Sequence, residues 1–406
     1  MAKNRISTWL LLIVLAAVLA IVAILGFVQY MGATATPLHP DPKNVPSATD
    51  GTPSPKWVGA VEQGRQLARA GLVEQNLPGL SVAVGIDGEI VWAEGFGWAD
   101  LENRVPVRPD LRFRIGHVSK ALTSAAVGLL LERGRLHLGD EIQKYVPTFP
   151  RKQWPVTLRQ LMGHMAGIRH YLGEEADIPS GHCERAADGL RSFADDPLLF
   201  EPETEYRYST YGWVLVSAAV EAAAGEPFFT FMRTQIFMPV GMNDTTPDSV
   251  EPIPDRVSFY FPRFSGDTHF GPEVARTVDY SCFAGAGAFL STPSDLVRFG
   301  MAIGRGKLLQ PDTVRTLQTR QQLASGKDTD YGLGWMLETV DLAGAPTQLA
   351  SHASRSLLGG STSFMTFPER GIVVAVMSNT SYAATRPIAL DVAQAFAESA
   401  ARPKAR

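Results

Sequence analysis

Cysteine is nearly absent from this sequence, which contains only Cys183 and Cys282 among its 406 residues. The eight histidines show neither an H-x-x-x-H nor an H-E-x-x-H spacing on an expected helix. Structural and catalytic metals are usually held by several such side chains at short spacing, so the sequence predicts no metal site. An oxidising compartment permits a bridge between the two cysteines, but the sequence leaves two separate thiols equally open.

Charge is also scarce, and its two signs nearly balance. Charged residues make up 19% of the chain, and the formal net charge is -4. A strong positive excess is the usual electrostatic signature of a nucleic-acid partner, and none is expected here. The length and the 45% hydrophobic content suffice for one large domain, or for two closely packed ones, with a sizeable core.

One stretch lacks both charge and proline altogether, from Trp9 to Phe27, and Lys3 and Arg5 precede it. This stretch is long enough to span a bilayer, whereas a secretory signal has a shorter apolar region. Because positive residues favour the cytoplasmic side, the rest of the chain is expected to be extracytoplasmic, either periplasmic or extracellular. The competing interpretation is a cleaved signal, since Ala33-Thr34-Ala35 resembles a cleavage site.

Three regions follow from this composition. Residues 1–31 form the expected membrane anchor, or an uncleaved signal. Residues 32–56 are rich in proline, threonine and alanine, and are expected to form an extended, semi-rigid linker. Residues 57–406 form the expected folded domain.

The folded region begins and ends with similar patterns. A helical pattern over Val58 to Val73 precedes two strand patterns joined by the turn signal Asp87-Gly88. A second pair of strand patterns, over Ser361 to Phe367 and Ile372 to Met377, precedes a closing helix over Pro387 to Ala400. Helical spacing dominates between about residues 117 and 240. The predicted fold class is α/β (α+β), with an antiparallel sheet flanked by helices and an inserted all-helical region.

The stretch from Phe113 to Lys120 reads F-R-I-G-H-V-S-K and opens a helix. Gly116 permits a tight entry, and His117 and Lys120, three residues apart, share a face of the first turn. The stretch resembles the S-x-x-K motif of the serine β-lactamase and penicillin-binding protein-like superfamily (class C β-lactamase-related serine hydrolases), in which Ser is the nucleophile and Lys its partner. Every position of the F-R-I-G-S-V-S-K form matches except the nucleophile, where His117 stands.

Further segments resemble motifs of the same superfamily, in the same order along about residues 57–400. They are Leu158–Gly167, Met238–Thr245, Gly285–Leu296 and Tyr331–Trp335. The resemblance implies an α/β part with an antiparallel sheet, an all-α part, and an active site between them. It also implies hydrolysis of an amide or ester through a serine acyl-enzyme, without a cofactor. The implied substrates are β-lactams, D-amino-acid peptides and small esters, which are small molecules or peptides with a reactive carbonyl group.

The resemblance assigns roles to the residues around that site. Lys120 takes the position of the base, where burial favours its neutral form; the alternative is a solvated lysine on a helix face. Tyr208, in Y-R-Y-S-T-Y-G-W, takes the position of the tyrosine that passes a proton between nucleophile and leaving group. Thr210 stands where Asn is usual and offers a hydroxyl in place of an amide. The alternative for these two residues is an aromatic cluster that caps the next helix.

The third motif of the superfamily, K-T-G or H-x-G on a strand, corresponds to His352-Ala353-Ser354-Arg355. His352 fits its first position. Ser354 replaces a glycine that lets substrate approach the strand closely, so its side chain is expected to crowd the cleft. Arg355 either offers a cation to a substrate carboxylate or faces solvent.

His117 leaves three interpretations open. In the first, the protein is a pseudoenzyme with an imidazole in the cleft and no hydroxyl to acylate. In the second, His117 is itself the nucleophile, although its longer ring misplaces the attack. In the third, Ser119 is the nucleophile, although neighbouring residues on a helix do not share a face with Lys120. The sequence therefore predicts a family member that is impaired or inactive as a hydrolase. The alternative is a binding or regulatory protein that keeps the cleft for peptidoglycan-like peptides or a partner protein.

Overall fold

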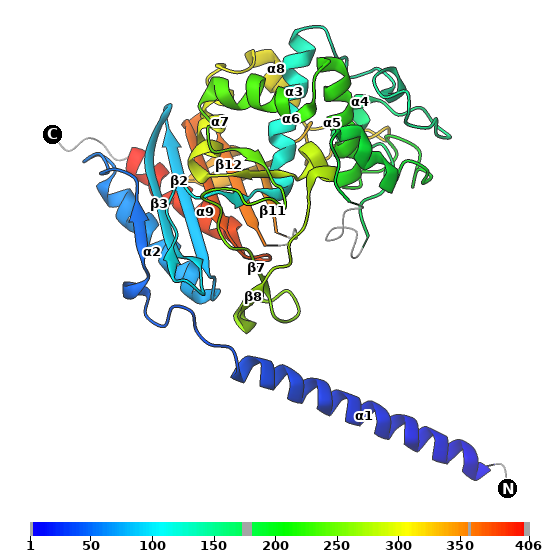
Figure 1. The fold of residues 1–406 in the computed structure, drawn as a ribbon, viewed down its shortest axis with the longest axis vertical. Helices are drawn as coiled ribbons and strands as arrows, with labels where there is room; N and C mark the ends of the chain where they lie inside the picture. The colour runs from blue at the N-terminus through cyan, green and yellow to red at the C-terminus, as the bar shows by residue number, and fades with distance from the viewer. Residues whose placement is uncertain (1–2, 173–180, 356–358, 402–406) are drawn as a thin grey trace.

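A computed structural model describes residues 3–172, 181–355 and 359–401. Its centre is an antiparallel sheet with the strand order β1-β3-β2-β13-β12-β11-β10, to which β4 adds by pairing with β3. Figure 1 shows this sheet beside a helical region, with one long helix extending away from the body. The predicted fold class is confirmed. The strands are β1 Ser47–Thr49, β2 Gly79–Ile86, β3 Glu89–Asp100, β4 Val105–Pro106, β10 Met336–Leu342, β11 Ala345–Ser354, β12 Ser361–Phe367 and β13 Ile372–Ser378.

The two ends of the folded region meet at the middle of this sheet. β2 pairs with β13 in an antiparallel register that places Val84 opposite Val374. The turn between β2 and β3 is formed by Asp87 and Gly88, both at positive φ, as the Asp-Gly signal predicted. The predicted strand pairs at both ends of the chain are therefore confirmed, and they are neighbours in space.

Helices cover both faces of the sheet, which explains why its central strands are apolar throughout. On one face, α2 (Val58–Glu74) and α9 (Thr385–Ala401) share a core with Val82 and Val84 of β2. On the other face, Ala83 of β2 belongs to the larger core, beside α7 (Pro293–Gly304), which contacts β2 and β13.

The helical region lies between the first and second halves of the sheet in sequence and contains the larger core. Its central helices, α3 and α5, contact each other, and almost every residue of α3 is buried. A short sheet with the order β5-β9-β6 leads the chain into α3. The elements are α3 Ser119–Glu132, α4 Leu158–Met162, α5 Thr210–Ala224, α6 Phe228–Phe231, α8 Pro311–Leu317, β5 Phe113–Arg114, β6 Thr246–Pro247, β9 Phe289–Ser291, and the separate pair β7 Tyr260–Pro262 and β8 Pro272–Val274.

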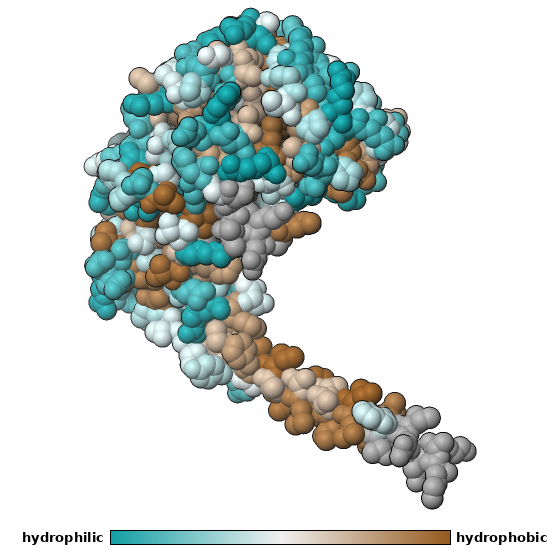
Figure 2. Space-filling model, turned by 45° about the vertical axis from the view of Figure 1, so that its right-hand side comes forward, coloured by the Kyte–Doolittle hydropathy of each residue, from teal (hydrophilic) through white to brown (hydrophobic). Residues whose placement is uncertain are grey.

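The N-terminal helix α1 (Lys3–Ala33) extends away from the body. Its segment Trp9–Ala33 is long and apolar enough to cross a membrane and is not buried against the rest of the chain. Figure 2 shows hydrophobic residues gathered on this helix, whereas the surface of the body is mainly hydrophilic. This arrangement agrees with either a membrane anchor or a signal sequence.

Part of the proline-rich segment, predicted as an extended, semi-rigid linker, packs against the folded body. Ser47–Thr49 forms β1 and pairs with Glu94 to Phe96 of β3, and Val45 is buried. The reason is that β4 pairs with β3 only at Trp98 and Asp100, which leaves the edge of β3 open at Glu94 to Phe96, and this short proline-free piece can hydrogen-bond there. The ordered body therefore begins before residue 57.

The two cysteines form a disulfide bond, Cys183–Cys282. The bond joins the segment before the 3-10 helix Ala186–Ser192 to the 3-10 turns of Ser281–Ala286. The sequence left this pairing open.

Candidate active site

The first motif forms a tight entry into α3. Ile115 donates its N–H to the carbonyl of Phe289 at 3.1 Å, which places the chain beside β9. Gly116 has φ 48, a conformation that suits glycine, and begins a 3-10 turn over Gly116–Val118. The α-helix itself begins at Ser119, slightly later than the motif suggested. His117 therefore lies in the turn and Lys120 in the first turn of the helix.

The His117 ring is almost completely enclosed, with 7% of the residue exposed. Its Nε2 lies 3.2 Å from Oγ1 of Thr210 and 3.4 Å from Oη of Tyr171. The ring centroid is 5.7 Å from that of Tyr208. Burial is the main cause that holds the pKa of His117 well below its usual value, with a smaller contribution from Lys120. The ring is therefore neutral, and hydroxyl groups converge on one of its nitrogens.

The Lys120 amine is fully buried. Its Nζ donates to the carbonyl of Ala286 at 3.0 Å and to Oγ1 of Thr210 at 3.3 Å, and it lies 5.0 Å from the centre of the Tyr208 ring. Among the described residues, no carboxylate forms an ion pair with it. Burial lowers the pKa of Lys120 well below 10.5, which favours the neutral amine that the base position requires.

The hydroxyl of Thr210 connects the Lys120 amine to the His117 ring through two hydrogen bonds. Since Lys120 donates to Oγ1 of Thr210, the hydroxyl proton of Thr210 is available to His117 Nε2. We therefore assign the neutral His117 tautomer with its proton on Nδ1. Thr210 is the first residue of α5, whose N-cap Ser209 accepts the N–H of Gly212 at 2.9 Å.

Tyr208 lies beside these groups, with its hydroxyl enclosed. Tyr208 Oη is buried and has no hydrogen-bond partner among the described residues, and burial raises its pKa well above 10. A buried hydroxyl without a partner is costly, and a catalytic role is one of the reasons for which such a group is retained. The Tyr208 ring therefore lies beside both Lys120 and His117, and the proton-transfer role of its hydroxyl remains a prediction.

The third motif lies on β11. His352 accepts from Tyr331 Oη at 3.1 Å through Nε2, and its Nδ1 lies 3.2 Å from the Ala353 carbonyl. Burial is the main cause that lowers the pKa of His352 to about 3. Ser354 is buried, and its Oγ has no partner among the described residues.

Arg355 follows the strand and is exposed. Its Nη2 donates to the carbonyl of Tyr382 at 3.1 Å, and the Tyr382 N–H donates to the Arg355 carbonyl at 2.7 Å. The guanidinium is thus tied to the neighbouring turn while the side chain still faces solvent.

Sequence reasoning missed Tyr171 beside His117, and it treated His164 and His170 as structural histidines without placing them at the site. His164 and His170 accept the N–H groups of Ser209 and Thr210, each at 3.1 Å through Nδ1. Tyr171, next to His170, contacts His117. These residues fix the Tyr208–Thr210 segment against the segment that follows α4. His164 belongs to a recognised motif, but no spacing marked His170 or Tyr171.

The histidines do not form a metal centre. Over the described ranges, no group of three or more His, Cys, Asp or Glu side chains is placed to hold a metal ion. Burial is the main cause that keeps the pKa of His170 at about 4, so this ring is also neutral.

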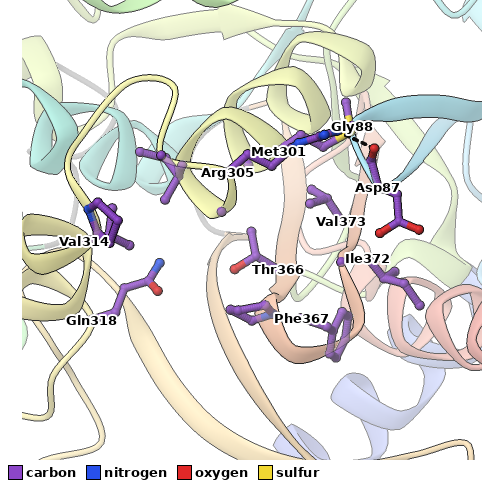
Figure 3. Close-up of a pocket in the computed structure, with 17 residues that line it drawn as sticks. Asp87, Gly88, Met301, Arg305, Val314, Gln318, Thr366, Phe367, Ile372 and Val373 are labelled. Atoms are coloured by element: carbon purple, nitrogen blue, oxygen red, sulfur yellow. Dashed lines mark hydrogen bonds between the residues drawn. The ribbon is translucent and has the colours of Figure 1, made fainter.

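A cavity of about 490 Å³ lies elsewhere on the body, among the β2–β3 turn, α7 and the β12–β13 turn. Figure 3 shows Met301 of α7 and Arg305, which follows α7, on one side and Phe367 and Ile372 on another. None of the predicted site residues lines it.

Lys120, Tyr208 and His352 lie together between an antiparallel sheet and a helical region. This arrangement is typical of the serine β-lactamases and penicillin-binding proteins. The sequence model of the Beta-lactamase family matches residues 64–398. The chain belongs to that family.

Relatives and structures agree with this assignment. The chain is 28% identical to the mouse (Mus musculus) protein "Serine beta-lactamase-like protein LACTB, mitochondrial", over 83% of this chain and 80% of that protein. It is 29% identical to "Esterase EstB" of Burkholderia gladioli, over 77% of this chain and 88% of the esterase. The structure of an octameric penicillin-binding protein homologue from Pyrococcus abyssi matches with a TM-score of 0.69 at 24% identity, over 81% of this chain and 76% of that one. At this identity the structural match supports the fold alone.

Proposed function

We propose that this protein is a membrane-anchored, extracytoplasmic member of the family in which His117 replaces the nucleophilic serine and blocks hydrolysis. Lys120 keeps the role of base and Tyr208 that of proton carrier, but no hydroxyl is available to be acylated at position 117. The cleft retains a binding role toward peptidoglycan-like peptides or other ligands with an amide or ester carbonyl. Thr210, His352, Ser354 and Arg355 take part in that binding.

The observation that carries this proposal is the hydrogen bonding of His117. Its unprotonated nitrogen, Nε2, faces Thr210 and Tyr171, so the lone pair that would attack a carbonyl is already engaged. Nδ1 carries the proton in the assigned tautomer and has no lone pair to offer. An attack by His117 would require both a tautomer change and the loss of these contacts.

The neighbouring serine does not replace the missing hydroxyl. Ser119 is fully buried, and its Oγ has no partner among the described residues. A nucleophile must reach both its base and the substrate carbonyl. Ser119 Oγ makes no hydrogen bond to Lys120, and neighbouring residues on a helix do not share a face, so Ser119 lacks the base that would activate it.

The location of the protein is proposed from the N-terminus. The apolar segment Trp9–Ala33 follows Lys3 and Arg5, which favours a cytoplasmic N-terminus. The disulfide Cys183–Cys282 supports an oxidising compartment for the domain.

The proposal is tested by exposing the full chain to a fluorophosphonate or a reactive β-lactam and measuring its intact mass. We expect no adduct on the parent protein, whereas binding of a D-alanyl-D-alanine peptide is expected in calorimetry. Arg355→Ala is expected to weaken that binding, because its guanidinium is proposed to meet the peptide carboxylate, and the exposed Arg315→Ala is the matched control. An adduct on His117 or Ser119 would show that the protein retains the acylation step.

A further inference from the structure

The loop between β7 and β8 contacts the end of the apolar helix. The Phe264 ring meets the Phe27 ring edge-on at 5.3 Å between centroids, and Phe270 packs against Phe264 at 5.4 Å. Figure 1 shows β7 and β8 projecting from the body toward the C-terminal end of α1. We call residues 263–271 the hairpin tip. Both of its phenylalanines are only partly buried.

An arginine fastens the tip to the helix. Arg263 Nη2 donates to the Met31 carbonyl and to Thr34 Oγ1, both at 3.2 Å. Its Nε donates to the Phe270 carbonyl at 2.8 Å. The guanidinium therefore lies about one helical turn beyond Phe27, on the side of the folded body.

The position of Phe27 along α1 indicates how deep in the membrane the hairpin tip lies. From Trp9 to Phe27, the helix rises by about 28 Å, which is close to the thickness of the hydrocarbon core, about 30 Å. With Lys3 and Arg5 at the opposite interface, Phe27 reaches the outer boundary of that core. Phe264, which touches Phe27, lies at the same level, and Arg263 lies at the level of the lipid headgroups.

We propose that the hairpin tip is a second membrane contact, in which Phe264 and Phe270 enter the outer interface of the bilayer that α1 crosses. This inference rests on the proposed membrane anchor. Aromatic rings are favoured in this region, and long cationic side chains near it can extend toward headgroups. The occupant of this surface is the lipid bilayer, because the tip is continuous with a helix whose length and composition suit the same bilayer.

A second contact gives the domain a fixed orientation. A single helix followed by a linker would leave the body free to rotate. The hairpin tip restricts that rotation, because it belongs to the folded body and is connected through β7 to residues beside the candidate active site. Tyr382 packs on Phe261 of β7 at 5.5 Å and exchanges backbone and side-chain hydrogen bonds with Arg355. Arg355, which follows the site residues of β11, is therefore linked through Tyr382 and β7 to the side of the body that carries the hairpin tip.

The experiment uses the full chain in phosphatidylcholine–phosphatidylglycerol vesicles. The only two cysteines of the chain are bonded to each other, so an introduced cysteine can be labelled selectively with NBD without a reducing agent. Phe264→Cys is the main variant, and His269→Cys, at an exposed position of the tip, serves if Phe264→Cys does not fold. Thr316→Cys, on the exposed face of α8 far from α1 in Figure 1, is the matched control.

We expect blue-shifted NBD emission at the tip and quenching by lipids brominated near the headgroup end of the acyl chain, with neither effect at residue 316. Blue-shifted emission without quenching by brominated lipid would mean that protein, such as a second copy, covers the tip, and it would overturn the inference. Water-like emission at the tip of a chain that floats with the vesicles would overturn the inference and leave the anchor intact. Failure of the full chain to float would overturn both.

Discussion

At position 117, Nε2 of an imidazole lies 3.2 Å from Oγ1 of Thr210 and 3.4 Å from Oη of Tyr171. One turn further along the chain, Lys120 is buried, and among the described residues its hydrogen-bond acceptors are a carbonyl and a hydroxyl. The amine is useful as a base because its charged form is destabilised, but that same burial costs folding free energy when the amine is protonated. In a protein without a nucleophile, the buried lysine still reduces the folding free energy, but it does not contribute to catalysis.

Lys120→Met is expected to raise the stability of the parent protein, most strongly at low pH. The folded pKa of Lys120 is below its unfolded value of 10.5, so the unfolded state binds the proton more tightly. The free energy of unfolding that the protein loses because of Lys120 therefore increases as the pH falls from 10.5 toward the folded pKa. The full loss is about 1.4 kcal/mol for each unit by which the folded pKa lies below the unfolded one. Urea unfolding at several pH values measures the effect.

The exposed Lys327→Met is the matched control and is expected to leave the pH dependence unchanged. If Lys120→Met is instead less stable at every pH, the hydrogen bonds of the amine outweigh its desolvation, and the electrostatic account of this site is wrong.

At the scale of elements, the site is assembled by short connections. The segment after α4 supplies His164 and His170, which bind the backbone at the start of α5. The 3-10 turns of Ser281–Ala286 supply the Ala286 carbonyl to Lys120. The disulfide from Cys183 to Cys282 fastens these turns to the segment near Ala186–Ser192.

Replacing both Cys183 and Cys282 by serine is expected to reduce the free energy of unfolding by about 2–4 kcal/mol, since the bond closes a long loop of the unfolded chain. The sequence separation of the pair is 99 residues. Chemical denaturation under non-reducing conditions compares the variant with the parent, and an unchanged midpoint would mean that the bond does not constrain the unfolded chain as supposed.

The sequence predicted the elements that carry strong periodicity or a turn signal. The strands on either side of Asp87-Gly88, and the pair that ends the chain, were found because alternation and turn residues agree. β1 was missed because proline-rich flanks suggested a linker, and only the open edge of β3 explains its pairing. Tyr171 was missed, and His170 was not placed at the site, because a loop has no period and their place depends on how α4 and α5 pack. Neither the spacing nor the surroundings of the two cysteines indicated their bond.

At the scale of the whole molecule, an apolar helix, a sheet and a helical region are arranged so that the candidate site lies between the last two. Figure 1 shows the helix leaving the body on the side where β7 and β8 project. If the helix spans the membrane with its basic end inside, the whole body is outside the cytoplasm.

Protease added to intact spheroplasts is therefore expected to digest the folded domain, whereas a cytoplasmic control protein stays protected. Full protection of the domain would contradict the proposed topology. A mature N-terminus close to Thr36 would indicate that the apolar segment is a cleaved signal.

The central claim is that a single side chain separates this site from acyl transfer, and His117→Ser tests it most directly. A serine there lies at the turn into α3, with Lys120 one turn on to take its proton and Tyr208 to pass it onward. Turnover is expected to remain slow, because Thr210 and Ser354 differ from the residues usual in the family, and the loss of one oriented donor costs about a hundredfold or more in rate.

The measurement is the intact mass of the parent, of His117→Ser, and of His117→Ser with Lys120→Ala, each after exposure to the same fluorophosphonate or β-lactam. Thermal unfolding first establishes that all three are folded. The account predicts a covalent adduct of one reagent per chain on His117→Ser, mapped to residue 117, and none on the other two. A folded His117→Ser protein that forms no adduct would contradict it, because the site would then be damaged beyond its nucleophile.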